Sequence, residues 1–331
     1  MMTYGGSTMA QEVMTGMNKL LWSQNATSKY KTKRKGEKIM MYELFIEKVV
    51  EAVKNEVGTG FDVTVNKVTK NNNLTLDGLV IKATDTNIAP TIYLNGYYER
   101  YKDGAMDLDD VVESIIDTYN HHNSVTFDVS TFTDFDAVKN RICYKLVNTA
   151  SNKKLLEDVP HRELFDLSVV YYVMVAVEDD ATGSILIHNN HLGFWDVTEN
   201  DLYEYASINT SKILPVNIKS MFDTLTEMVD MEDFYNTDDF MYVLTNKEKL
   251  QGASTILYPD VLSTFADRKN ANLWLLPSSI HEWIIVCDDG NMNRETLSEM
   301  IQEVNGSQLA PDEVLSDHPY YYNRTTKVLS A

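Results

Sequence analysis

The sequence predicts an α+β fold in which largely antiparallel sheets pack against helices. Strand-like segments cluster with helical segments between them, and hairpin patterns stand at both ends of the folded region. The hydrophobic content of the 331 residues, 44%, is that of a globular chain. This length suits one large domain or two of ordinary size. We expect an N-terminal part over about 41–180 and a C-terminal part over about 181–331, packed either as one unit or as two subdomains.

The N-terminal part begins with a predicted helix over Tyr42–Val57. Its apolar residues recur at helical spacing, and Gly58 follows as a stop signal. Residues 61–65 alternate between apolar and polar side chains, and the asparagines at 71–73 lead into a return strand over 74–81. This pattern predicts a β-hairpin. Two further elements are expected in this part: a strand at 88–94 and a helix at 107–119.

The middle of the chain contains its longest apolar run, Leu167–Val177. The run is too short to cross a bilayer and reads as a buried strand or core helix. Thr198 and Asp201 have the spacing of a capping box, which predicts that a helix starts there and continues to about residue 211. The other expectations are a strand or helix at 141–146, a strand at 184–188, a helix at 222–228 and an exposed acidic loop at 230–239.

The last third alternates short strands with helices. The clearest helix spans 294–304, where four large apolar residues share one face. The other expected elements are strands at 240–244, 273–276 and 282–286, a helix across 252–266, and a closing hairpin formed by 320–322 and 327–329.

Charge divides the chain into two unequal pieces. The formal net charge is −20, yet residues 1–40 contain seven basic and two acidic side chains. These residues therefore form a basic arm, either a disordered tail or an extension upstream of a native start at Met40 or Met41. The acidic remainder argues against nucleic acid as the partner of the folded body.

The cellular compartment is predicted from what the sequence contains. Its two cysteines, Cys143 and Cys287, are far apart in the sequence, which fits buried thiols in a reducing environment. The first residues lack the order of a secretory signal, and no apolar run reaches the length of a transmembrane helix. We therefore predict a bacterial cytoplasmic protein.

One segment carries candidate catalytic residues. Ser279, His281 and Glu282 place a hydroxyl, an imidazole and a carboxyl between two predicted strands, and nucleophilic catalysis needs these groups to converge. The Gly-x-Ser-x-Gly pattern is not present here. The alternative interpretation is a connection between strands in which the hydroxyls cap the backbone and the histidine is hydrogen-bonded structurally.

No cofactor or metal is predicted. The sequence has neither a glycine-rich phosphate loop nor a dinucleotide fingerprint. His188 and His191 are three residues apart across a strand end, without the carboxylate spacing of a known metal motif. The acidic runs do not match a calcium loop.

Long ordered blocks of the chain resemble a family of uncharacterised proteins that is frequent in gut anaerobic Gram-positive bacteria. The resemblance covers about 42–331 and implies a bacterial cytoplasmic setting but no activity or site residues. A weaker resemblance, over 185–305, is to a second uncharacterised bacterial family. The blocks that carry the first include APTIYLNGYYERYKDG (89–104), ILIHNNHLGFWDVTENDLYEYASINT (185–210), YVLTNKEKLQGASTILYPDVL (242–262) and LLPSSIHEWIIV (275–286).

The leading hypothesis for function is a non-enzymatic binding or interaction protein with a protein partner, such as an accessory product of mobile elements. The tyrosines at 320–322 are expected to be exposed for this purpose. The first alternative is an enzyme of unknown class that uses Ser279, His281 and Glu282. The second is an acidic mimic of nucleic acid that occupies a basic partner. The oligomeric state is left open.

Overall fold

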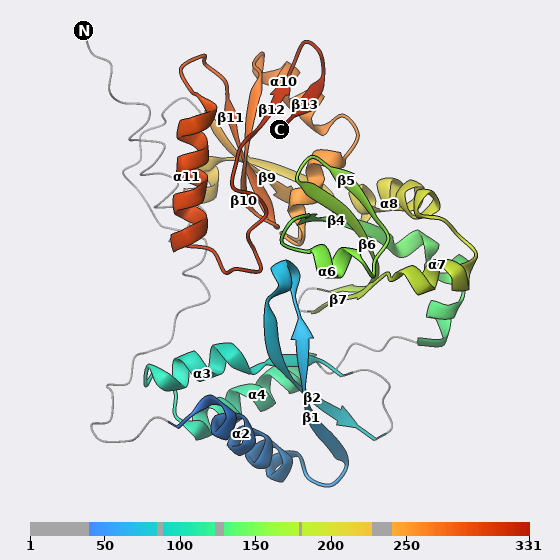
Figure 1. Cartoon of the computed structure of the whole chain (residues 1–331), viewed down its shortest axis with the longest axis vertical. Helices are drawn as coiled ribbons and strands as arrows, with labels where there is room; N and C mark the ends of the chain where they lie inside the picture. The colour runs from blue at the N-terminus through green and yellow to red at the C-terminus, as the bar shows by residue number, and fades with distance from the viewer. Residues whose placement is uncertain (1–39, 85–88, 123–128, 179–180, 227–239) are drawn as a thin grey trace.

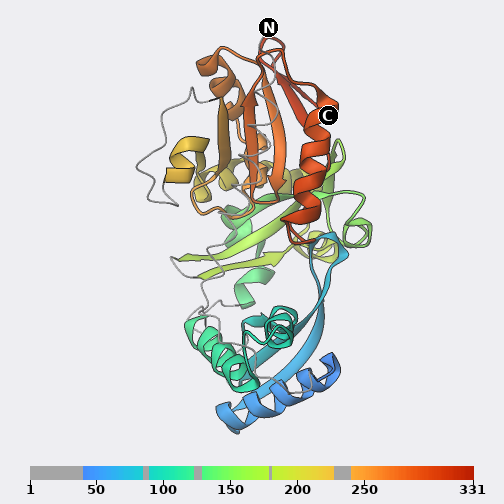
Figure 2. The same cartoon turned by 90° about the vertical axis from the view of Figure 1, so that its left-hand side faces the viewer.

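The computed structural model describes residues 40–84, 89–122, 129–178, 181–226 and 240–331. Its strands form three sheets, and the pairs between these strands are antiparallel. Helices pack against the sheets, so the predicted α+β class is confirmed (Figures 1 and 2). The basic arm, apart from Met40, and the whole of the predicted acidic loop at 230–239 lie outside the described residues.

The first sheet belongs to an N-terminal unit, which comprises the described residues from 40 to 122 and has its own core. Three helices pack on the long β1–β2 hairpin, and residues such as Phe45, Leu79 and Ile115 are fully buried between them. Of the strand predicted at 88–94, residue 88 lies outside the described residues and Thr91–Tyr93 form the strand, which ends there because Leu94 begins a helix. The elements are α2 (Tyr42–Val57), β1 (Phe61–Thr69), η1 (Asn71–Asn73), β2 (Thr75–Ala83), β3 (Thr91–Tyr93), α3 (Leu94–Lys102) and α4 (Leu108–His122).

The second sheet is built around one long strand, β6 (Leu167–Glu178). The apolar run of the sequence is therefore a strand, and the ambiguous segment at 141–146 is a strand beside it. The predicted strand at 184–188 ends two residues early. The other elements here are η2 (Val129–Thr133), α5 (Phe135–Val138), η3 (Lys139–Arg141), β4 (Ile142–Asn148), α6 (Lys153–Leu156), β5 (His161–Leu164), β7 (Ala181–Leu186), α7 (Asn189–Trp195) and α8 (Glu199–Ile213).

The third sheet has six strands in the order β13-β12-β10-β11-β9-β8. Helix α11 covers one face, and the other face joins the second sheet in one large core. The predicted closing hairpin is confirmed by β12 and β13. The elements are β8 (Val216–Ser220), α9 (Met221–Thr226), β9 (Met241–Asn246), η4 (Gly252–Leu257), α10 (Val261–Lys269), β10 (Leu273–Ser279), β11 (Glu282–Cys287), α11 (Arg294–Ser307), β12 (Tyr320–Asn323) and β13 (Val328–Ser330).

Two expectations about this last third are corrected by the structure. The helix predicted across 252–266 is two pieces, because Pro259 follows η4 and Asp260 takes a left-handed backbone conformation with φ of 60°. The tyrosines at 320–322 are not an exposed group. Tyr320 is fully buried and Tyr322 nearly so, because their strand pairs with β10 over the large core.

The hydrophobic cores divide the described chain between residues 122 and 129 rather than at 180. Residues from Val138 to Tyr322 contribute to one large core, whereas the N-terminal unit has a separate one. The predicted boundary at 180 falls inside the β6–β7 hairpin, whose strands are hydrogen-bonded. We call the part from residue 129 onward the C-terminal unit.

Candidate functional site

The predicted candidate residues lie together on the β10–β11 hairpin. Ser279 ends β10 and Glu282 begins β11, so His281 belongs to a two-residue connection. The Ser279 hydroxyl accepts a hydrogen bond from the backbone N–H of His281 at 3.0 Å. The Nδ1 atom of His281 accepts one from the backbone N–H of Gln251 at 3.2 Å.

These contacts determine what the hairpin can do chemically. A serine nucleophile needs its hydroxyl within reach of a base, and here the hydroxyl meets a backbone amide instead. Glu282 accepts a hydrogen bond from the hydroxyl of Ser278 at 3.1 Å. The Ser279 hydroxyl thus caps the backbone, as in the alternative interpretation, whereas the Ser278 hydroxyl bonds the Glu282 carboxyl. This geometry does not favour a catalytic triad at Ser279, His281 and Glu282.

Burial favours the neutral forms of the two ionisable side chains on this hairpin, Glu282 and His281. Loss of water raises the pKa of Glu282, although its bond to Ser278 opposes the shift. Burial also lowers the pKa of His281, and the charge of Lys145 adds to that effect. Both side chains therefore favour their uncharged forms more than they would in water.

Two ionisable residues near this hairpin were missed by sequence reasoning. Lys145 lies in β4, where desolvation lowers the pKa of its ammonium to about 8. Glu313 has a buried carboxyl oxygen with no hydrogen-bond partner, and burial raises its pKa to about 7. A lysine inside the apolar segment ICYKLV was a visible signal for the first. No feature of the sequence pointed to Glu313.

His188 and His191 form hydrogen bonds at the start of α7. His188 Nδ1 lies 2.7 Å from a carboxylate oxygen of Asp158, and His191 Nδ1 accepts the backbone N–H of His188 at 3.1 Å. Burial lowers the pKa of His191. Within the described ranges, no group of three or more His, Cys, Asp or Glu side chains could hold a metal ion.

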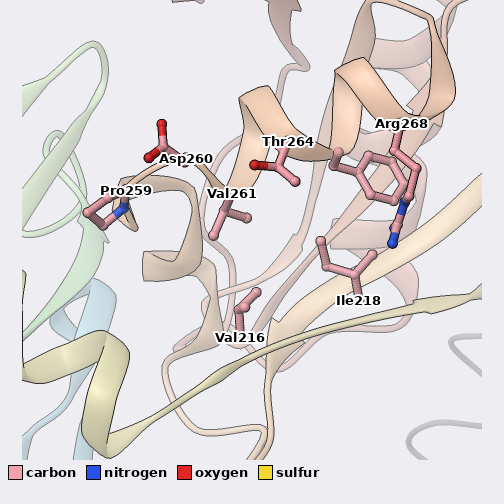
Figure 3. A pocket seen from close by; sticks show the side chains of 8 residues that line it. Val216, Ile218, Pro259, Asp260, Val261, Thr264 and Arg268 are labelled. Atoms are coloured by element: carbon pink, nitrogen blue, oxygen red, sulfur yellow. The ribbon is translucent and has the colours of Figure 1, made fainter.

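A shallow apolar groove of about 240 Å³ lies between β8 and α10 (Figure 3). Val216 and Ile218 extend from β8 toward the helix, which presents Val261 and Phe265. Val216 is 37% exposed, a large fraction for a branched apolar side chain. The rest of the groove is lined by Pro259, Asp260, Thr264 and Arg268.

Arg268 gives one end of the groove a positive charge. Its guanidinium carbon lies 5.0 Å from the centre of the Phe265 ring, and the side chain is exposed. Among the residues that the structure describes, Arg268 has no carboxylate within ion-pair distance. This is notable in a chain with twenty more acidic than basic side chains.

The fold and these features define an α+β protein with a small apolar groove on its C-terminal unit. Residues 42–324 match a family of unknown function (DUF5688), and the chain belongs to this family. Comparison with curated proteins and with solved structures finds no match. No helix in the described ranges is both long and apolar enough to cross a membrane.

Proposed function

We propose that this is a non-enzymatic cytoplasmic protein that binds a partner protein through the groove between β8 and α10. The observation that carries the proposal is the combination of exposed Val216 with an apolar hollow at Val261. Exposed apolar surface in a concave site is typical of a surface where proteins bind.

The size of the groove limits what it can hold. About 240 Å³ is smaller than the usual pocket for a drug-sized ligand, which is roughly 300–1,000 Å³. It is enough for one large apolar side chain that anchors a partner. The polar atoms of Asp260 and Thr264 lie at the rim, where an anchoring segment would leave the hollow (Figure 3).

The positive charge at the rim of the groove further limits which partner segments would fit. The Arg268 guanidinium has no acidic partner among the described residues, although it lies at the groove. An acidic residue next to the anchoring side chain would pair with it without disturbing another ion pair. We therefore propose a partner segment with a large aliphatic or aromatic residue beside Asp or Glu.

Site-specific photo-cross-linking in lysate of the source cells tests this proposal. A photoreactive residue at Thr264 should capture a partner, whereas the same residue at exposed Glu299 on α11 should not. Val261→Arg fills the groove and should reduce capture at least tenfold, because anchors of this kind contribute about 2 kcal/mol or more.

A second variant tests the charge at the rim of the groove. Arg268→Glu should weaken capture severalfold, and the difference from the wild type should shrink as salt screens the rim charges. Thermal melting of both variants checks that the fold is retained. Equal capture by wild type and Val261→Arg would reject the groove as the binding site, even if a protein is captured.

A further inference from the structure

The tip of the β1–β2 hairpin connects the two units of the molecule. The hairpin extends from the N-terminal unit to α6 and to the segment that follows α11 (Figures 1 and 2). Asn72 donates from Nδ2 to the backbone oxygens of Pro311, at 2.9 Å, and Val314, at 2.7 Å. Asn71 donates in the same way to Asp312 at 2.8 Å. We call these three bonds the clasp.

The same tip is fixed on its other side by α6 and the turn before it. The backbone N–H of Asn72 donates to Oδ1 of Asn152 at 2.9 Å, and Asn152 donates back to Oδ1 of Asn72 at 2.9 Å. Asn73 donates to the backbone oxygen of Ser151 at 2.8 Å. Because Asn72 and Asn73 both have φ of 57°, asparagine suits the turn as well as the bonds.

A carboxyl group with an unsatisfied oxygen lies in the loop that receives the clasp. Glu313 Oε2 is buried and has no hydrogen-bond partner, while the backbone oxygen of Glu313 accepts from Ile280 at 2.9 Å. Asn71 Oδ1 is buried without a partner as well. Ionisation of Glu313 would therefore place charge at a buried oxygen without a hydrogen bond, which is unfavourable. A hydrogen bond from the Ala310 backbone opposes this effect, but burial and the charge of Asp312 outweigh it, and the net pKa shift is upward.

The charges around the loop do not provide Glu313 with a clear counter-ion. Asp312 is next to it and repels a second negative charge. The charge of Asp312 raises the pKa of His281, and the charge of Lys145 lowers it. The ammonium nitrogen of Lys70 lies 4.1 Å from the centre of the Tyr93 ring. Other titratable or charged groups around this loop are Lys249 and Glu282 on the side of the β10–β11 hairpin. At the end of the loop, Asp166 accepts from the Ser316 hydroxyl at 2.8 Å and lies 3.3 Å from Nε2 of His318.

We propose that the loop at 310–316 is a pH-sensitive latch: the clasp is closed while Glu313 is protonated, and ionisation of Glu313 releases the hairpin tip. This device goes beyond the proposed binding function and does not depend on it. It would control how firmly the N-terminal unit is held against the C-terminal unit.

The direction of the effect follows from proton linkage. Burial raises the pKa of Glu313 from an ordinary value near 4.5 to about 7 in the closed state. The closed state therefore binds more protons than the open state between these values, and it loses stability as pH rises through this window. The ratio of open to closed molecules should increase by at most about tenfold per pH unit, and above pH 7 it should become constant.

Hydrogen exchange of the full chain at pH 5 and pH 8 tests the latch, after correction for the intrinsic exchange rates. The amide of Asn72 donates to Asn152 on the other side of the tip, so its exchange reports release of the whole tip rather than of the three clasp bonds alone. We expect protection of a peptide covering 70–75 to fall severalfold or more at pH 8. Glu313→Gln should remove most of that dependence, and Glu299→Gln on α11 should keep it.

Two results would overturn the proposal. Equal protection of the tip in the wild type at both pH values would show that the clasp does not respond to pH. An equal fall in the wild type and Glu313→Gln would assign the response to another group, such as Lys145 or His281. Asn72→Ala should open the tip at both pH values, which calibrates the signal of the released state.

Discussion

Gly252 shows how closely single residues fit around the β10–β11 connection. A Cβ atom added there would lie 2.2 Å from Oγ1 of Thr245 and 2.3 Å from the backbone oxygen of His281. Those two atoms are themselves joined by a hydrogen bond of 2.8 Å. The glycine therefore allows η4 to approach the connection closely, and the geometry of His281 depends on it.

Gly252→Ala should lower the free energy of unfolding by about 3 kcal/mol, because backbone atoms must move to admit the methyl group. Gly306 in α11 is the matched control, since a Cβ there has nothing within 4 Å. Gly306→Ala should raise the free energy of unfolding by about 0.5–1 kcal/mol. Urea denaturation measures both. A neutral Gly252→Ala would mean that the loop adapts easily.

At the same scale, the candidate residues show what sequence reasoning can and cannot predict. The proximity of Ser279, His281 and Glu282 followed from their spacing in the sequence. Their partners did not, because Gln251 lies 30 residues away from His281 along the chain. The shifted pKa values of Lys145 and Glu313 likewise depend on burial by distant segments, which no local pattern reveals.

Among the helices, α8 has the start that the sequence predicts most directly, through the capping box of Thr198 and Asp201. Thr198 donates from Oγ1 to the Asp201 carboxylate at 2.6 Å, and its backbone N–H reaches the same oxygen at 2.7 Å. The Thr198 hydroxyl also accepts from the backbone N–H of Asp201. This confirms the predicted capping box, and these bonds lower the pKa of Asp201.

Thr198→Ala should lower the free energy of unfolding by about 1 kcal/mol, because the first turn of α8 loses its side-chain acceptor. Thr198→Ser keeps the hydroxyl and should remain within about 0.5 kcal/mol of the wild type. Thermal and urea denaturation of the two variants provide the comparison. Similar losses in both would indicate that the methyl group, rather than the cap, stabilises this position.

The interrupted helix at 252–269 shows where an element cannot be read from its own residues. Apolar spacing alone favoured one helix, but Pro259 and the left-handed Asp260 divide it. The groove depends on that division. Pro259, Asp260 and the start of α10 line it together with β8, which is more than 40 residues earlier in the sequence.

At the scale of the whole molecule, two cores stabilise two units. Ile115 is fully buried in the core of the N-terminal unit, and Ile285 is fully buried in the core shared by the second and third sheets. The units contact each other through the tip of the β1–β2 hairpin. Such contacts involve few apolar groups, so we expect the cores to respond separately to mutation.

Ile115→Ala should increase amide exchange across α2, β1 and β2 and leave β9–β11 nearly unchanged. Ile285→Ala is the matched control and should have the opposite pattern. Each substitution removes a fully buried branched side chain and should cost about 2–4 kcal/mol within its own unit. Uniform loss of protection in both variants would show that the molecule unfolds as one cooperative body.

Local sequence patterns were enough to predict the α+β class, the β1–β2 hairpin, the full extent of α2 and the cap of α8. These features depend on periodicity and on residues close together in the chain, which interact in any context. Packing between distant segments was needed to reveal the division near residues 122–129, the burial of Tyr320, the groove beside Arg268 and the clasp at Asn72. Each of these joins segments from distant parts of the sequence, and the loss of water on packing, rather than local propensity, sets their chemistry.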